Sequence, residues 1–461
     1  MSSSETGLTS ENPFLESDDL PEGWRLAYLG EVCTPPQYGW TTSSANGSSG
    51  LKIVRTSDIS SGKVDWSTVP ICKEEPENIE KFLLNPGDIL ISRAGSVGTS
   101  FLIKDCPRAV FASYLIRFRA LPSIETNYLG LFLKSRQYWD SIAGETIGIT
   151  IPNVNASKLK QIPIPLPPLA EQQRIVARVE ALLTHINAAH DQLRRVPLIM
   201  KKFRQAVLAA ACFGRLTAGW REEHPDFKHE PCEKADMEIP DDWDIPEEWQ
   251  WSTISGVCEK VVDCPHSTPK WTQSGKICIR TSEIKPYYLD LSQARYVSEE
   301  TYHERIQRLE PEEGDIVYSR EGTLGQAAII PKGLNICLGQ RIMLLRSGSH
   351  CSPFFLTYLI NSPQILKIVN ELTTGSTSPH INVGDVKKFP IPLPPLAEQH
   401  EIVRRVNALF ERADAIEREV VAANRRCERL TQAVLGKEFR GELVEREAAY
   451  LERTKKILFD E

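Results

Sequence analysis

The chain has 461 residues, of which 41% are hydrophobic and 25% are charged, and its formal net charge is −7. This composition is typical of a globular protein with a sizeable core, and it excludes a membrane-spanning protein because no apolar run approaches the ~18 residues that a spanning helix needs. The negative charge argues against a protein that coats DNA by itself, although a local basic patch could still bind DNA inside a larger complex.

Residues 1–19 are rich in Ser and Glu and are predicted to form a disordered tail. After this tail, the chain contains one long segment twice. The stretch Pro21–Trp24 returns as Pro246–Trp249, and Ile162–Gln172 returns almost unchanged as Phe389–Gln399. A repeat of this length is a duplicated domain, because the units of a solenoid run to only ~20–50 residues. A molecule with two equivalent halves suits a ligand with two separated half-sites, and DNA is the obvious candidate.

The first globular segment, residues 20–161, is predicted to be a mixed α/β domain. Short runs rich in β-branched and aromatic residues predict strands, and a helix is expected over Asn127–Ser141. The predicted strands are Leu51–Arg55, Asp88–Ser92 and Ala109–Arg119. The second copy, residues 245–388, repeats the pattern with strands at Lys276–Arg280, Asp315–Ser319 and Ile336–Arg346 and a helix at Pro353–Glu371.

The glycine-rich segment Gly87–Gly98, with its copy Gly314–Gly325, has the features of a contact loop. A strand ends there in Ser-Arg and then turns on glycines, which let a backbone approach a ligand closely. The segment is not a phosphate-binding loop, because the closing Gly-Lys-Ser/Thr is missing. Arg93 and Arg320 are therefore candidate DNA contacts, and an ordinary hairpin turn is the alternative.

A polar loop differs between the two copies. Tyr38–Gly50 corresponds to Asp263–Gly275, and both are rich in side chains that can read base edges. A shared scaffold with different polar loops is what two readers of different sequences would show, whereas two unrelated surface loops are the alternative. Residues 146–155 and 374–382 form a third, weaker candidate beside the proline run.

Each globular segment leads through its proline run into a helical one, at residues 162–216 and 389–444. Proline tolerates the first turn of a helix, so Pro167-Pro168 suits a helix entry, and Glu171 then complements the helix dipole. The residue before each proline favours extended geometry, so the preceding stretch is predicted to be a strand or a polyproline connector.

Heptad spacing follows in both copies. The apolar residues, in steps of four and three, are Ile175, Val179, Leu182, Ile186, Ala189, Leu193, Val196, Met200, Phe203, Val207 and Ala210, and then Ile402, Val406, Leu409, Ala413, Ile416, Val420, Ala423, Cys427, Leu430 and Val434. This spacing predicts two helices that pair as a coiled coil, with a local kink at Pro197.

The acidic linker at residues 217–244 favours an antiparallel pair of helices. The first helix would span about 65 Å at ~1.5 Å per residue, and the linker could cover that distance only when stretched. Antiparallel helices remove this demand and would place the globular segments at opposite ends of a rod. The charged residues 445–461 are interpreted as a tail or as a further partner contact.

No catalytic or metal motif stands out. The 11 cysteines are scattered without a C-x-x-C pair, which favours reduced thiols in a cytosol. Cys258, Cys264 and His266 could belong to a metal site, but no fourth ligand is evident and the first repeat lacks two equivalents, so core or loop thiols are preferred. The chain lacks the Asn-Pro-Pro-Tyr motif of an amino-methyltransferase, a P-loop, H-E-x-x-H and G-x-S-x-G. We therefore expect neither catalysis nor a cofactor in this chain.

The duplicated proline-to-helix signature, the Pro-Glu-x-Trp openings and the stretch Phe203–Leu208 with Gly214–Thr217 closely resemble the specificity subunit of type I restriction-modification enzymes. The resemblance covers the chain from Leu20 to about Val444. It implies two α/β (α+β) target-recognition domains, related by a pseudo-two-fold axis, that each read one half of a bipartite, asymmetric DNA site. It also implies a bacterial or archaeal cytoplasmic protein of phage defence.

The resemblance further implies that the helical regions set the spacing of the half-sites and bind two modification subunits. Those subunits would carry S-adenosylmethionine and methylate adenine, and ATP- and Mg-dependent cleavage would reside in a separate restriction subunit. Two other classes remain as alternatives: a fused methyltransferase or nuclease, and a structural coiled-coil scaffold. The missing catalytic motif counts against the first, and the divergent polar loops count against the second.

The candidate contact residues follow from these loops, strand ends and helix ends. The candidate DNA contacts are Tyr38, Trp40, Thr41, Asn46, Arg55, Ser57, Ser92, Arg93, Ser96, His266, Lys270, Trp271, Gln273, Arg280, Ser282, Ser319, Arg320, Thr323, Ser376 and His380. The candidate contacts to modification subunits are Glu171, Gln172, Arg174, Arg204, Gln205, Glu398, Gln399, Arg404 and Gln432.

Overall fold

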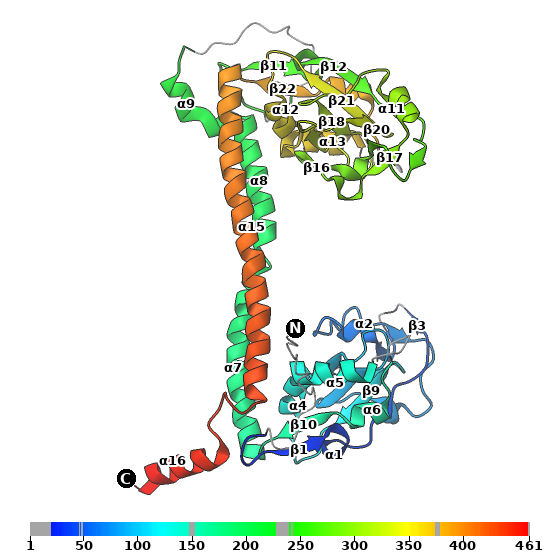
Figure 1. The fold of residues 1–461 in the computed structure, drawn as a ribbon, viewed down its shortest axis with the longest axis vertical. Coiled ribbons are helices and arrows are strands. Elements are labelled where there is room, and N and C mark those ends of the chain that lie inside the picture. The colour runs from blue at the N-terminus through cyan, green and yellow to red at the C-terminus, as the bar shows by residue number, and fades with distance from the viewer. Residues whose placement is uncertain are drawn as a thin grey trace, which may run out of the picture. The chain divides into compact units, whose positions relative to one another are not determined.

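A computed structural model describes residues 20–45, 47, 49–146, 153–226, 239–240, 243–373 and 379–459 of the chain. The chain forms two compact units, each with one globular part and stretches of two long helices (Figure 1). The first unit comprises Met1–Arg194 and Ala422–Glu461, and the second comprises Arg195–Val421. The expected disordered tail, residues 1–19, lies outside the described residues.

The globular part of the first unit combines two four-stranded sheets with short helices. One sheet has the strand order β2-β9-β6-β7 with antiparallel neighbours, and the other has the order β3-β5-β4-β8 with β4 and β8 parallel. The strands are β1 (Arg25–Tyr28), β2 (Gln37–Tyr38), β3 (Ser44–Ala45), β4 (Lys52–Val54), β5 (Ile71–Cys72), β6 (Asp88–Ser92), β7 (Ser100–Leu102), β8 (Ala109–Phe111), β9 (Leu115–Arg119) and β10 (Pro163–Leu166). The helices are α1 (Leu29–Val32), α2 (Thr56–Ile59), α3 (Ile79–Phe82), α4 (Thr126–Phe132), α5 (Arg136–Thr146) and α6 (Ala156–Lys160).

The second unit repeats this plan. Its sheets have the orders β12-β21-β18-β19 and β13-β17-β14-β20, and β14 and β20 are parallel like β4 and β8. The strands are β11 (Gln250–Thr253), β12 (Cys258–Asp263), β13 (Trp271–Thr272), β14 (Lys276–Ile279), β15 (Ile284–Lys285), β16 (Tyr288–Leu289), β17 (Arg295–Val297), β18 (Ile316–Ser319), β19 (Ala327–Ile329), β20 (Ile336–Leu338), β21 (Ile342–Ser347) and β22 (Pro390–Leu393). The helices are α9 (Ala218–Glu223), α10 (Ile254–Val257), α11 (Glu299–Ile306), α12 (Pro353–Ile360), α13 (Pro363–Thr373) and α14 (Val383–Lys387), with 3-10 turns η2 (Arg215–Thr217), η3 (Thr281–Glu283) and η4 (Leu291–Gln293).

The predicted mixed α/β class is confirmed, but two element boundaries differ in both copies. The segment predicted as one strand over Ala109–Arg119 is two strands, β8 and β9, which belong to different sheets, and Ile336–Arg346 likewise divides into β20 and β21. The predicted helices also divide, into α4 with α5 and into α12 with α13. The break was missed because only three residues separate the strands in each copy. Ser113 in the first copy and Gly339-Gln340-Arg341 in the second interrupt the apolar run and are the signal for a turn.

The proline runs form strands, as the extended geometry predicted. Strand β10 pairs antiparallel with β1, and β22 pairs with β11. Proline lacks the N–H that a central strand must donate, so a two-stranded ribbon with free edges accommodates it. Both runs then lead directly into a long helix.

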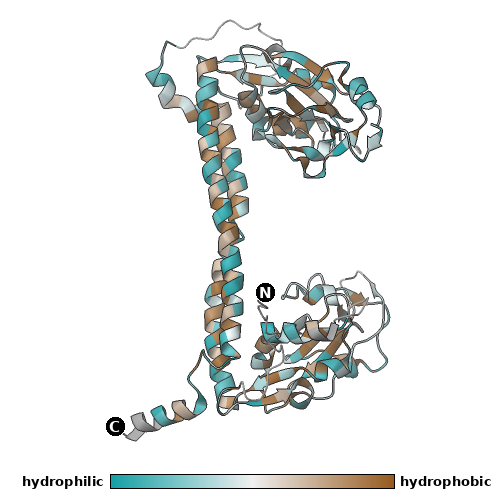
Figure 2. Ribbon diagram, viewed as in Figure 1, coloured by the Kyte–Doolittle hydropathy of each residue, from teal (hydrophilic) through white to brown (hydrophobic). Residues whose placement is uncertain are grey.

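Each unit has a main core where its first sheet, the helices behind it and a long helix meet. Figure 2 shows hydrophobic residues along the strands of both globular parts. A buried aspartate forms an ion pair in each first sheet: Asp88 in β6 is 2% exposed and lies 2.5 Å from Arg119 of the neighbouring strand, and Asp315, just before β18, lies 2.8 Å from Arg346 of β21. The Gly-Asp pair at the start of each glycine-rich segment therefore anchors a central strand.

Three long helices carry the predicted coiled-coil residues: α7 (Leu169–Leu193), α8 (Val196–Cys212) and α15 (Leu396–Glu438). The predicted interruption is confirmed, because α7 ends at Leu193 and α8 begins at Val196 with Pro197 in its first turn. The residues interpreted as a charged tail contain a further helix, α16 (Glu447–Phe459).

The contacts between α8 and α15 in the second unit show the relative direction of the two helices. Arg204 of α8 contacts Glu417 of α15 at 2.8 Å, and Thr217, after α8, bonds Glu398 near the start of α15. These pairs confirm the predicted antiparallel packing. In the first unit, Arg174 near the start of α7 pairs correspondingly with residues beyond the end of α15.

The predicted seam is wrong at two positions of α15. Ile416 and Leu430 are 45% and 54% exposed, whereas Leu435, which the pattern did not include, is buried. The predicted seam residue Val420 is buried as expected. An α-helix has 3.6 residues per turn, so a strict repeat of 3.5 drifts around its surface over several turns. The buried face therefore leaves the predicted heptad positions in the later turns of this helix.

Candidate nucleic-acid interface

In the first unit, three predicted loop segments meet beside the end of β6. The N–H of Arg93 donates to the carbonyl of Tyr114 at 2.9 Å, and the carbonyl of Arg93 accepts from the N–H of Val154 at 3.0 Å. The Arg93 guanidinium carbon lies 5.1 Å from the centre of the Tyr38 ring, within cation–π range. The Tyr38 hydroxyl accepts from the N–H of Ala156 at 3.0 Å. The glycine-rich segment, the polar loop and the segment before the proline run thus share one edge of the domain.

The same segments meet in the second unit. The N–H of Arg320 donates to the carbonyl of Arg341 at 3.0 Å, and its carbonyl accepts from the N–H of Ile381 at 3.1 Å. The Arg320 guanidinium lies 3.0 Å from Oδ1 of Asp263, and Oδ2 of the same carboxylate lies 3.3 Å from Nε2 of His266. We call this edge, in either unit, the convergent edge.

Three predicted DNA contacts are buried under the convergent edge. Ser92 and Ser319 are fully buried, and each hydroxyl donates to the carbonyl two residues further on. Arg320 is 8% exposed and its guanidinium also donates to the carbonyl of Ile381. Ser92 and Ser319 have no exposed surface to offer a base edge, and the small exposed part of Arg320 belongs to a side chain that is already paired. This placement speaks against base contact by these three residues and favours a role in supporting the loop backbone.

Arg55 and Arg280, which each begin a repeated Arg-Thr-Ser sequence, also form bonds within their own domain. Arg55 bonds Asp58 through its N–H and its guanidinium, and Arg280 bonds Glu283 in the same way. These bonds close the turn that follows β4 and β14. The Arg55 and Arg280 side chains stay 42% and 28% exposed, so both can still meet a ligand.

The remaining predicted DNA contacts are accessible, with two outside the described residues. Exposed residues are Tyr38, Thr41, Ser57, Ser96, His266, Lys270, Gln273, Ser282 and His380, and half-buried ones are Trp40, Arg93, Trp271 and Thr323. The indole N–H of Trp40 donates to the carbonyl of Glu74 at 3.0 Å, and the Thr323 hydroxyl donates to that of Thr281 at 2.8 Å. Asn46 and Ser376 lie outside the described residues.

Two predicted partner contacts, Glu171 and Glu398, lie in the core, each 1% exposed. The indole N–H of Trp24 donates to Glu171 at 2.9 Å, and that of Trp249 donates to Glu398 at 2.8 Å. We call each pair a tryptophan–glutamate clasp. It explains the Pro-Glu-x-Trp openings: the tryptophan fastens the start of each globular part to the start of the helix that follows it. Sequence reasoning missed this pairing, although both residues recur together in the repeat.

The two glutamines next to these glutamates are buried for a related reason. Gln172 donates to the carbonyl of Pro167 at 2.8 Å and accepts from the N–H of Glu125. Gln399 donates to the carbonyl of Pro394 at 2.9 Å and accepts from the N–H of Ser352. The Glu and Gln of the Pro-Pro-Leu-Ala-Glu-Gln signature therefore form hydrogen bonds within their own unit. This speaks against partner contact by Glu171, Gln172, Glu398 and Gln399.

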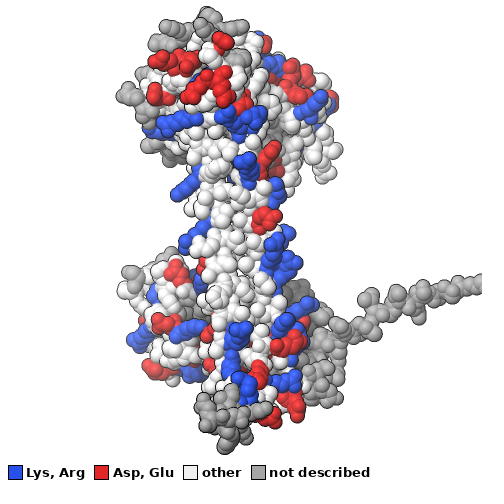
Figure 3. All heavy atoms as spheres, turned by 90° about the vertical axis from the view of Figure 1, so that its left-hand side faces the viewer, with Lys and Arg blue, Asp and Glu red and all other residues white. Residues whose placement is uncertain are grey.

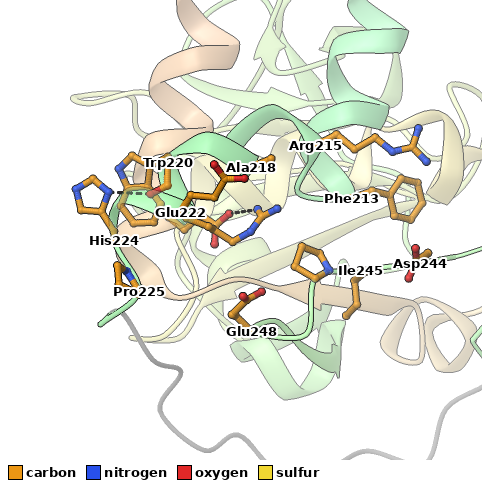
Figure 4. A pocket seen from close by; sticks show the side chains of 13 residues that line it. Phe213, Arg215, Ala218, Trp220, Glu222, His224, Pro225, Asp244, Ile245 and Glu248 are labelled. Atoms are coloured by element: carbon orange, nitrogen blue, oxygen red, sulfur yellow. Dashed lines mark hydrogen bonds and ion pairs between the residues drawn. The ribbon is translucent and has the colours of Figure 1, made fainter.

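The second clasp contains a cation. Glu398 also accepts from the Thr217 hydroxyl at 2.6 Å and lies 2.5 Å from the Arg221 guanidinium. A cavity of about 570 Å³ lies beside it, and Figure 4 shows its lining drawn from α9 and the chain before β11. Within the cavity wall, Trp220 stacks on His224 with ring centres 4.4 Å apart. None of the predicted DNA contacts lines this cavity.

Of the other predicted partner contacts, Arg174 and Arg204 form ion pairs between helical segments, and Gln205, Arg404 and Gln432 are exposed. A hydrogen bond from Arg404 lowers the pKa of Glu401 to about 2. Figure 3 shows Lys and Arg side chains spaced along the helices with uncharged surface between them. The helices also carry apolar residues that are 41% to 61% exposed, namely Leu169, Leu198, Ile199, Ile416, Val421, Leu396 and Leu430.

The thiols considered for a metal site have other surroundings. Cys264 is buried and its sulfur accepts from the N–H of Ile342 at 3.3 Å, whereas His266 is exposed. Within the described ranges, no group of three or more His, Cys, Asp or Glu side chains is arranged to hold a metal. No helix in the described part of the chain is long and apolar enough to cross a membrane.

Two copies of one domain, each presenting different side chains from an equivalent edge and each continued by a long helix, define a duplicated recognition protein. Residues 21–195 and 246–422 match the type I restriction modification DNA specificity domain. The chain belongs to this family.

Curated relatives resemble the chain over almost its whole length. The specificity subunit of the type I restriction enzyme EcoKI from Escherichia coli K12 is 29% identical over 450 residues, covering 93% of this chain and 91% of the relative. That of StySPI from Salmonella potsdam is 30% identical, covering 92% and 90%. A chain from a solved structure on complex assembly and conformational transition of the type I R-M system aligns with a TM-score of 0.62 at 23% identity, covering 92% and 99%, and thus shares the fold.

Proposed function

We propose that this chain is the non-catalytic DNA-specificity subunit of a type I restriction-modification enzyme and that each convergent edge reads one half of a bipartite, asymmetric DNA site. One observation carries the proposal. Equivalent backbone hydrogen bonds hold the three segments of both edges together, whereas the side chains presented there differ, as Tyr38 and Asp263 do at one equivalent position. A constant scaffold with variable polar contacts is the arrangement that direct readout of two different base sequences requires.

The proposal includes partners that supply the chemistry. Two modification subunits dock on the helices and methylate adenine with S-adenosylmethionine, and a restriction subunit cleaves DNA with ATP and Mg²⁺, in a bacterial or archaeal cytoplasm. The exposed apolar residues of the helices support the docking step, because burial of such side chains against a partner is favourable. Leu169 and Leu396 support two equivalent docking sites, since they begin α7 and α15 and are both 41% exposed.

Sequencing of the methylome tests this function directly. A host that expresses the chain together with its modification subunit is expected to carry N6-methyladenine in one bipartite motif, and a host with either protein alone is expected to carry none. Methylation by this chain alone would support the fused enzyme instead. If the wild-type chain and its modification subunit copurify in the absence of DNA but produce no methylated motif, the structural scaffold becomes the better explanation.

Shortening the helices is expected to change the spacer between the half-sites. Removal of seven residues from the α7–α8 segment and of seven opposing residues from α15 keeps the heptad phase, because seven residues make two turns of a coiled coil. The loss of about 10 Å of helix corresponds to roughly three base pairs. The methylome of this variant should show the original half-sites at a different spacing. A change in the half-site sequences themselves would contradict the idea that the helices measure distance.

A further inference from the structure

A short turn separates the two strands that the sequence had predicted as one, and in both units this turn lies at the convergent edge. Residues 112–114 join β8 to β9, and residues 339–341 join β20 to β21. The last residue of this turn is Tyr114 in the first unit and Arg341 in the second. Tyr114 is 61% exposed, and so is the side chain of Arg341. The two repeats thus project different large side chains into solvent from one backbone position.

Backbone contacts fix this position firmly. The carbonyls of Tyr114 and Arg341 accept the N–H groups of Arg93 and Arg320, the arginines at the centre of each convergent edge. In the first unit, the turn is also bound to the polar loop. The N–H of Trp40 donates to the carbonyl of Phe111, and Trp40 forms a β-bridge with Ala112. Each exposed side chain therefore stands on a rigid base, as a reader of base edges must.

Arg341 adopts a backbone conformation that disfavours any side chain. Its φ is +69°, and the only other described residue besides glycine with a positive φ is Tyr287. A Cβ atom is strained in this region, and glycine would avoid the strain. An exposed arginine at a strained position makes no packing contribution that explains it, so the observation points to a role for its side chain.

An ion pair links the Arg341 guanidinium to the glycine-rich segment of the same edge. Its Nε lies 2.9 Å from a carboxylate oxygen of Glu321. The backbone of Glu321 forms an antiparallel β-bridge with that of His380. The neighbouring Gln340 side chain donates to the carbonyl of His266. The contact to Glu321 runs through Nε, whereas a bidentate contact to a base uses the two Nη groups.

We infer that Arg341 and Tyr114 are specificity-determining residues that each read one base pair, and this inference rests on the proposed function. Arg341 reads a guanine in the half-site of the second unit, because two guanidinium N–H groups match O6 and N7 of guanine in the major groove. Tyr114 reads an A·T pair in the half-site of the first unit, where its ring contacts the thymine methyl group. The turn residue thus accounts for part of the difference between the two half-sites.

The test uses the full chain coexpressed with its modification subunit, and the methylome as the readout. Arg341→Gly removes the guanidinium and relieves the backbone strain, so loss of folding is not expected. It should relax one guanine position in one half-site, with discrimination falling about 5- to 150-fold, the usual worth of a bidentate contact. Arg341→Lys keeps the charge but loses the fork, and it should relax the same position. Tyr114→Ala should relax a single A·T position in the other half-site.

Lys332→Ala is the matched control. Lys332 is an exposed cation on the turn before β20, at the opposite end of this strand from Arg341, and its loss should leave the motif unchanged. An unchanged motif in both Arg341 variants, with a bipartite wild-type motif, would overturn the inference while the proposed function stands. Relaxation of the same half-site by the Tyr114 and Arg341 variants would overturn it too. If the wild-type pair yields no bipartite motif, the proposed function fails and the inference fails with it.

Discussion

Replacing Glu398 with alanine is expected to destabilise the second unit by about 3–5 kcal/mol, the usual loss when one partner of a buried ion pair is removed. The substitution leaves the indole N–H of Trp249, the Thr217 hydroxyl and the Arg221 guanidinium without their shared acceptor. Arg221 dominates the loss, because its side chain is 17% exposed and water can solvate only part of its charge. Amide hydrogen exchange of α9 and β11 measures the effect locally, since a chain of two units need not unfold in one step.

Glu171→Ala is the matched control in the first unit. Glu171 accepts from Trp24 and from the N–H of Glu447, but no cation among the described residues forms an ion pair with it, and it repels the carboxyl group of Glu438. Its removal should cost only about 1–3 kcal/mol, the penalty for unsatisfied buried donors. An equal or larger loss in Glu171→Ala would contradict the idea that the cation, rather than the tryptophan, makes the second clasp strong.

The repeat made much of the fold predictable. Duplication set the domain class, the proline runs predicted the paired ribbons, and Pro197 predicted the interruption between α7 and α8. These features depend on local backbone geometry, such as the fixed φ of proline, and local geometry can be predicted from the sequence. The glycine-rich segment was likewise correctly placed at a turn, since Gly95 and Gly98 both have a positive φ.

The roles of individual polar residues were not predictable in the same way. Glu171 looked like a surface residue of a first helical turn, yet it is buried because Trp24, 147 residues earlier, lies against it. Ser92 and Arg320 looked like contacts because their types suit DNA, yet their burial depends on which loops fold over them. Such long-range burial follows from the tertiary fold, and residue type alone does not encode it.

One carboxyl group of the first unit has no counterpart in the second. Glu438, at the end of α15, is fully buried, and neither of its carboxyl oxygens has a hydrogen-bond partner among the described residues. Burial, followed by repulsion from Glu171, raises its pKa from the ordinary 4.5 to about 8. The equivalent residue in the first repeat is Ala211, which is also buried. Glu438 is therefore neutral at low pH and must be ionised in an apolar site at high pH.

This asymmetry predicts that the first unit loses stability as pH rises. Between pH 4.5 and about 8 the folded state holds a proton on Glu438 that the unfolded state has released, so the free energy of unfolding falls by up to about 1.4 kcal/mol per pH unit. The contribution is complete below pH 4.5 and is lost as pH passes through 8. Glu438→Ala, which copies Ala211, should remove this slope, even if it also leaves a small cavity. Hydrogen exchange of α4 and the last turns of α15 at pH 6 and pH 8.5 measures the difference. A wild-type chain whose first unit is equally protected at both pH values would show that Glu438 stays charged and finds a partner in solution.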